Sequence, residues 1–174
     1  MSDKTVLFKT VHGSRLYGLA HENSDEDFYT VVDKVKNRKA RYARQSIVGD
    51  EDSMVVDFGT WVDMCKSGVP QALEAMFSDM AVEDHIEEFR KSFRVGTQCY
   101  DRYLRTIKSF ALSETDPFKR KRHSLRLALN FRQMREYGRF NPTLSKHQAE
   151  GITWVAQAWS GEEVYDFALG LAWE

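Results

Sequence analysis

The spacing of hydrophobic residues divides the chain into two parts. In the first 80 residues, short apolar segments rich in β-branched and aromatic side chains alternate with polar turns. This pattern is typical of strands. We expect two main strands, over residues 5–11 and 27–32, and two shorter ones, over residues 45–48 and 54–57.

Helical spacing begins directly after the last of these strands. Apolar side chains recur there at i, i+3, i+4 and i+7, which is the pattern of one buried helix face. These residues are Phe58, Trp61, Val62 and Cys65. Gly68 and Pro70 end this helix, and a second short helix is expected over residues 71–77.

The rest of the chain is predicted to be helical. Strand signals stop near residue 80, and apolar residues then recur at helical spacing. Five helices are expected, over residues 86–93, 100–110, 118–137, 152–159 and 164–171. We therefore predict an α+β fold. A small mixed β-sheet with flanking helices occupies residues 1–80, and a C-terminal helical bundle over residues 81–174 packs on it.

Charge and composition narrow the class of protein. The chain has 174 residues, 42% of them hydrophobic, and a formal net charge of -1, so its surface as a whole is not built for a polyanion. Two local segments are basic, residues 34–44 and 119–122. Each is either a solvated surface or a contact for nucleic-acid phosphates. Two cysteines in helical patterns and no long apolar run indicate a soluble, cytoplasmic protein without a membrane span.

The candidate chemistry lies near the start of the chain. Gly13 and Ser14 follow the first strand, and a Gly-Ser turn that opens a helix offers backbone N–H groups and a hydroxyl to a phosphate. Asp25 and Asp27 open the second strand, where residues i and i+2 point to the same face. Two carboxylates aimed at one spot repel unless a cation lies between them, so this pattern predicts a divalent metal and phosphate chemistry.

A third carboxylate is needed to complete such a metal site. Asp57, at the end of a later apolar strand, is the best candidate for a second metal or for a general base. It is also well placed to cap the helix that begins at Phe58, and the two roles are compatible.

These residues resemble a known family, the nucleotidyltransferases of the DNA polymerase β superfamily, and within it the small predicted enzymes of bacteria and phages. The family signature is a Gly-Ser turn followed by Ser-Asp-x-Asp at the start of a strand, which residues 13–18 and 24–27 match. Position 26 is Glu where the family usually has an apolar residue. Weaker likeness continues through residues 56–61, 68–77, 122–127 and 137–142.

The resemblance implies a nucleotidyltransferase core that uses two Mg²⁺ ions and a nucleoside triphosphate, ATP in particular. Asp25, Asp27 and Asp57 are then the metal ligands and catalytic acids. Gly13 and Ser14 are assigned to the β and γ phosphates. Arg15 adds a phosphate contact or pairs with a surface acid.

Three further residues are candidates for the nucleotide site. Arg122, His123 and Arg126 share one helix and are spaced to close over a nucleotide, or else they form a solvated basic face. Glu74, on the short helix, is expected to tie down a neighbouring arginine rather than to act in catalysis. The histidines at positions 12, 21, 85 and 147 show no metal-ligand spacing and are taken as incidental.

The predicted activity is transfer of a nucleoside monophosphate to an unidentified hydroxyl, with release of pyrophosphate. The acceptor is a small molecule, a protein or an RNA, and a partner protein is conceivable. A second hypothesis is a non-catalytic nucleotide-binding or antitoxin-like regulatory module of the same fold. A third, a metal-dependent phosphohydrolase, is less favoured because no motif supplies a base for water.

Overall fold

A computed structural model describes residues 5–33, 43–48 and 51–174. Within these residues, five strands form one mixed sheet in the order β3-β4-β2-β1-β5. Its strands are β1 Val6–His12, β2 Glu26–Val32, β3 Ala43–Val48, β4 Glu51–Asp57 and β5 Ala81–Asp84. Only β2 and β4 run parallel, and the other neighbours are antiparallel.

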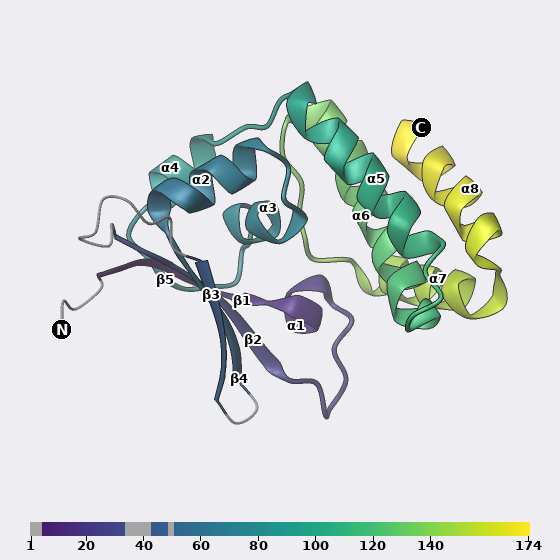
Figure 1. Cartoon of the computed structure of the whole chain (residues 1–174), viewed down its shortest axis with the longest axis horizontal. Coiled ribbons are helices and arrows are strands. Elements are labelled where there is room, and N and C mark those ends of the chain that lie inside the picture. The colour runs from purple at the N-terminus through teal and green to yellow at the C-terminus, as the bar shows by residue number, and fades with distance from the viewer. Residues whose placement is uncertain (1–4, 34–42, 49–50) are drawn as a thin grey trace.

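The helices form two groups around this sheet (Figure 1). One group, α2 to α4, lies over one face of the sheet, and α1 follows directly from β1. The bounds are α1 Gly13–Tyr17, α2 Phe58–Lys66, α3 Pro70–Met76 and α4 Glu87–Ser92. The second group is the helical half of the molecule, α5 Tyr100–Ala111, α6 Pro117–Tyr137, α7 Lys146–Ala158 and α8 Gly161–Trp173. Helix α6 packs against the other three.

One continuous hydrophobic core joins the sheet to both groups of helices. On the sheet it contains Phe8 and Tyr29, and α2 contributes Trp61, all almost fully buried. The same cluster extends into the helical half through residues such as Ile107 and Phe131. Burial of these large side chains supplies most of the driving force for folding. The helical half is therefore placed firmly against the sheet.

The predicted α+β fold is confirmed, with one wrong detail. A fifth strand, β5, lies beyond residue 80 and pairs antiparallel with β1 at the edge of the sheet. Its four residues carry two acids and only one β-branched side chain, so their sequence gives a weak strand signal. Backbone pairing and a salt bridge from Arg90 to Asp84 hold this edge in place.

Several smaller expectations are also resolved. Gly138 ends α6 in the left-handed conformation at φ +69°, as its position predicts. Cys65 and Cys99 are free, buried thiols. Most of the basic segment 34–44 lies outside the described residues. In the part of the chain that is described, no helix has the length and apolar character needed to cross a membrane.

Candidate active site

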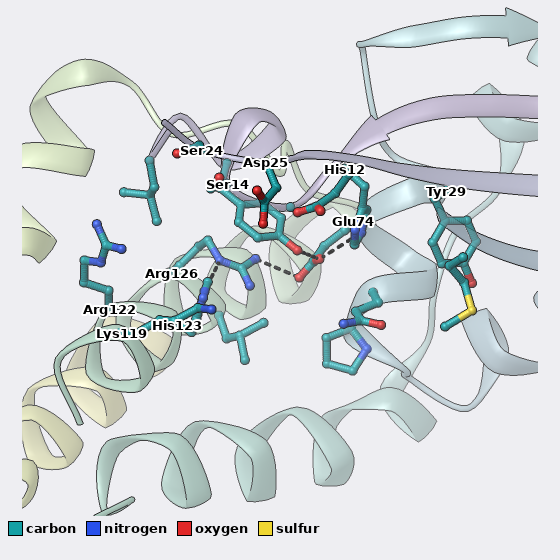
Figure 2. A pocket seen from close by; sticks show the side chains of 18 of the residues that line it. His12, Ser14, Ser24, Asp25, Tyr29, Glu74, Lys119, Arg122, His123 and Arg126 are labelled. Atoms are coloured by element: carbon teal, nitrogen blue, oxygen red, sulfur yellow. Dashed lines mark hydrogen bonds and ion pairs between the residues drawn. The ribbon is translucent and has the colours of Figure 1, made fainter. Parts of the chain in front are cut away.

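A cavity of about 740 Å³ lies between the start of the sheet and the helical half (Figure 2). One wall comes from α1, the start of β2 and α3, and the other comes from α5 and α6. Seven of the predicted site residues line it, namely Gly13, Ser14, Asp25, Asp27, Arg122, His123 and Arg126. Arg15 and Asp57 are not among the residues that line this cavity.

Gly13 and Asp27 lie in direct contact. Gly13 has φ +65°, and a Cβ atom built on it would lie 2.0 Å from Oδ2 of Asp27. The preceding residue, His12, is the register partner of Asp27 across β1 and β2. Only glycine leaves room here, because the conformation is left-handed and the space is taken by the carboxylate. The Gly-Ser turn and the second acid are therefore parts of one structure.

Asp25 is held beside Asp27 by the backbone of the loop before β2. Arg15 donates hydrogen bonds to the carbonyl oxygens of Ser24, at 2.8 Å from Nη2, and of Asp25, at 3.3 Å from Nε. Arg15 thus positions this loop, which is a third role beside the phosphate contact and the acidic partner considered from sequence. Glu26 is exposed and does not line the cavity, as expected for the residue between two acids on the opposite face.

A buried network closes the inner end of the cavity around Glu74. Its Oε1 accepts a hydrogen bond from Nη1 of Arg126 at 2.7 Å, and its Oε2 accepts one from the hydroxyl of Tyr17. Nε2 of His12 lies 3.4 Å from the same Oε2. Figure 2 shows Glu74 between His12 on one side and Arg126 on the other. The expected tie between Glu74 and an arginine is confirmed.

The charges of this network explain how a carboxylate is tolerated at full burial. Burial alone would raise the pKa of Glu74, but the positive charge of Arg126, together with the nearby His12 and the hydrogen bond from Tyr17, lowers that pKa to about 2. The guanidinium of Arg126 also stacks on the ring of Tyr17, 3.6 Å from its centroid. Glu74 is therefore ionised, and the network joins α1, α3 and α6.

A family comparison agrees with this geometry. The family model described as RlaP, RNA repair pathway DNA polymerase beta family, matches residues 1–159. The protein belongs to the RlaP family. The match includes the Gly-Ser turn, both acids and most of the helical half, and it confirms the resemblance to polymerase β-like nucleotidyltransferases. A search of curated proteins finds no match.

Arg126 also determines the state of His123 in this RlaP protein. Its Nε donates a hydrogen bond to Nδ1 of His123 at 3.3 Å, so a neutral imidazole carries its proton on Nε2. Burial, and then the positive charge of Arg126, lowers the pKa of His123 to about 3. His123 is therefore an uncharged side chain that lines the cavity, and among the described residues nothing accepts a hydrogen bond from its Nε2–H, which can donate to a ligand there.

The structure does not bring Asp57 together with Asp25 and Asp27. In the parallel pair of β2 and β4, Asp57 is opposite Val32, whereas Asp27 is opposite Asp52. Five residues of strand separate the two positions, or about 16 Å. The Asp57 carboxylate instead caps α2, accepting from the backbone N–H of Thr60 at 3.0 Å and from its hydroxyl at 2.7 Å. The capping role considered from sequence is the one observed.

The basic segment 119–122 divides between two roles. Lys121 binds the carbonyl oxygen of Trp159 at 2.8 Å, and Arg120 binds the hydroxyl of Ser113 at 3.1 Å, so these two hold the helices together. Lys119 and Arg122 line the cavity instead. Two of the four basic side chains therefore line the cavity.

His12 is the site residue that the sequence pattern does not single out. It is buried beside Glu74 and lines the cavity, although it has no metal-ligand spacing to other histidines. Its place directly before Gly13 is the available signal, since the last residue of β1 must lie beside the turn. No group of three or more histidine, cysteine, aspartate or glutamate side chains able to hold a metal occurs in the described ranges.

Proposed function

We propose that this protein transfers a nucleoside monophosphate from a nucleoside triphosphate, with ATP as the first candidate, to a hydroxyl group and releases pyrophosphate. The observation that carries the proposal is the contact of Asp27 with Gly13 on a cavity that Asp25 and Ser14 also line. The Gly-Ser turn, which we propose binds phosphate, and the two carboxylates therefore lie at the same cavity. Membership of a polymerase β-like family supports the same reaction class.

Asp25 and Asp27 would hold the divalent metal, Mg²⁺ in this proposal. Their oxygen donors suit a hard cation, and both line the same cavity. When bound, Mg²⁺ supplies positive charge to the triphosphate and lowers the pKa of the attacking hydroxyl. Asp57 is left out of this site because of its distance, and Asp52 is the β4 residue whose register places it beside Asp27.

Gly13 and Ser14 would bind the triphosphate. The first N–H groups of a helix have no partner within the helix. His12, at the N-cap position of α1, makes no side-chain cap hydrogen bond to them. Ser14 adds a hydroxyl, and the absence of a side chain on Gly13 lets a phosphate approach the backbone.

The residues on α6 would act on either side of the bound nucleotide. His123 offers an uncharged N–H to an acceptor atom of the base or sugar. The guanidinium of Arg126 is hydrogen-bonded to Glu74 and stacked on Tyr17. We therefore assign Arg126 a role in positioning α1 and α6 rather than a direct phosphate contact. Arg122 and Lys119 keep their charge toward the cavity.

Labelled substrate tests this proposal. The protein is incubated with Mg²⁺ and ATP carrying a label on its α phosphate, in the presence of RNA, protein or small-molecule acceptors. Transfer predicts label on one acceptor with equimolar pyrophosphate. Free labelled AMP alone would indicate a hydrolase, and tight ATP binding without pyrophosphate release in any mixture would indicate the regulatory module. Either result would overturn the proposal.

A further inference from the structure

A second cavity, of about 600 Å³, adjoins the candidate active site. Leu19 and Arg122 line both cavities, so the two spaces adjoin at these residues. The outer wall of the second cavity is α7, which contributes Lys146, Glu150 and Trp154. Nothing in the proposed nucleotide site uses this space.

Within the described residues, Arg122, at the junction, has no acid at ion-pair distance, although Asp116 acts on its charge from farther away. Its side chain is half-buried and stacks on the ring of Phe118, 4.9 Å from the centroid. Its Nε is buried and makes no hydrogen bond within the described part of the protein. A buried guanidinium nitrogen without a hydrogen-bond partner is costly, so this position favours an anionic ligand between the two cavities.

Trp154 is the second unusual feature. It is 61% exposed, although a tryptophan is ordinarily one of the more buried residues. Lys146 lies on the same helix, in a weak 3.8 Å pair with Glu150. Trp154 thus lines one cavity together with two cations, Arg122 and Lys146. Aromatic rings and cations in one groove can bind single-stranded nucleic acid, with a base stacked on the ring and the phosphates near the cations.

We propose that the second cavity binds the acceptor as a single-stranded polynucleotide, whose terminal hydroxyl enters the active-site cavity past Arg122. A base stacks on Trp154, Arg122 binds the phosphate that lies between the two cavities, and Lys146 binds a phosphate farther out. Glu150 opposes this binding and limits its strength. The RNA repair description of the family favours RNA over DNA. The inference rests on the proposed transfer reaction, because it names that reaction's acceptor.

Binding of a labelled oligonucleotide tests the proposal without any need for catalysis. A fluorescein-labelled, unstructured 12-nucleotide RNA is titrated with protein, and anisotropy gives the Kd. Trp154→Ala is expected to weaken binding by roughly 5-fold to 150-fold, the range for loss of one stacked base, whereas Trp154→Phe keeps a ring and most of the affinity. Trp173→Ala is the matched control, because Trp173 is 50% exposed but lines neither cavity.

Two variants that change charge, and a DNA oligonucleotide, are measured in the same binding assay. Lys146→Ala is expected to lower the slope of log Kd against log salt by about 1, and Glu150→Gln to tighten binding. A DNA strand of the same sequence identifies the sugar. Tighter RNA binding supports an RNA acceptor, and equal binding supports a single-stranded polynucleotide of either kind.

The results that overturn the proposal are distinct from failure of the transfer reaction. If wild type transfers label from α-labelled ATP, but Trp154→Ala and Trp173→Ala both bind RNA as wild type does, the acceptor site is wrong while the transfer reaction stands. If duplex RNA competes as well as single strands, it is also wrong. If Trp154→Ala does not fold, tryptophan fluorescence replaces it as the test. Quenching by RNA in wild type that is lost in Trp154→Phe would support stacking on Trp154, and equal quenching in both proteins would contradict it.

Discussion

Arg126 on α6 donates a hydrogen bond to Glu74 on α3 at 2.7 Å, and both side chains are buried. This pair connects the longest helix of the helical half to the elements that carry the Gly-Ser turn. Tyr17 of α1 binds the same carboxylate, so Glu74 links α1 in one wall of the active-site cavity to α6 in the other wall. The geometry of the cavity therefore depends on residues that need not touch substrate.

Loss of one partner from this pair should strongly destabilise the fold. We expect Arg126→Ala and Glu74→Ala each to lower the free energy of unfolding by about 3–5 kcal/mol, because each leaves a charge buried without its partner. Urea denaturation followed by circular dichroism measures this. Arg105→Ala, which breaks an exposed pair with Asp101 at 3.1 Å, is the control and should change little. Equal effects for buried and exposed pairs would contradict the account.

The same network predicts acid sensitivity. The pKa of Glu74 is lowered to about 2 in the folded protein, so its stabilising contribution is present above its ordinary pKa of 4.5 and is lost as the pH falls from 4.5 toward 2. The pKa of His123 is lowered from 6.5 to about 3, so acid also favours unfolding between these values. Unfolding free energies measured from pH 7 to pH 3 should fall, with a shallower slope below pH 5 in Glu74→Gln. An unchanged slope in that variant would contradict the assignment.

Gly13 should not tolerate any side chain. In Gly13→Ala the new Cβ would meet Oδ2 of Asp27 and the backbone would be strained at φ +65°. We expect nucleotidyl transfer to fall at least about 100-fold as the carboxylate is displaced, if stabilisation through Asp27 is worth several kcal/mol. Gly151→Ala is the matched control, since no atom lies within 4 Å of its new Cβ. Transfer by Gly13→Ala at the wild-type rate would show that this contact is unimportant.

Substitution of Asp57 should affect the stability of the fold, whereas substitution of Asp52 should affect nucleotidyl transfer. Asp57→Ala removes the cap of α2 and is expected to cost about 1 kcal/mol of folding free energy, with transfer per folded molecule nearly unchanged. Asp52→Asn should reduce transfer, because its register position is beside Asp27. Thermal melts and labelled-ATP assays on both variants distinguish these effects. Loss of activity only in Asp57→Ala would return Asp57 to the metal site.

Short-range patterns in the sequence predicted much of this site. The Gly-Ser turn and the Asp-x-Asp strand start are local features, and their contact follows from the pairing of neighbouring strands β1 and β2. The pairing of Glu74 with an arginine was also predicted, because an acid on a short helix can bind a neighbouring arginine, but the full burial of this pair is seen only in the structure. The bounds of α5 and α6 were predicted to within one residue, since apolar spacing over many residues is a strong signal. Helix α7 begins at Lys146, six residues before the predicted start.

The relationships that the sequence did not show are between distant segments. Asp57 looked like a third ligand because it ends a strand, but a parallel register between β2 and β4 is not visible in either strand's sequence. Strand β5 has little intrinsic strand preference and exists because β1 offers an edge to pair with. His12 gained its role from Glu74, which is 62 residues away along the chain.

Asp25 and Asp27 are proposed here as the metal-binding acids of a nucleotidyl transfer site. The most direct measurement is label transfer from α-labelled ATP with Mg²⁺ by the Asp25→Asn/Asp27→Asn double variant, with Glu26→Gln as the matched control on the exposed position between them. We predict that the double variant loses transfer by at least about 100-fold while Glu26→Gln keeps it. Undiminished transfer by the folded double variant would contradict the account.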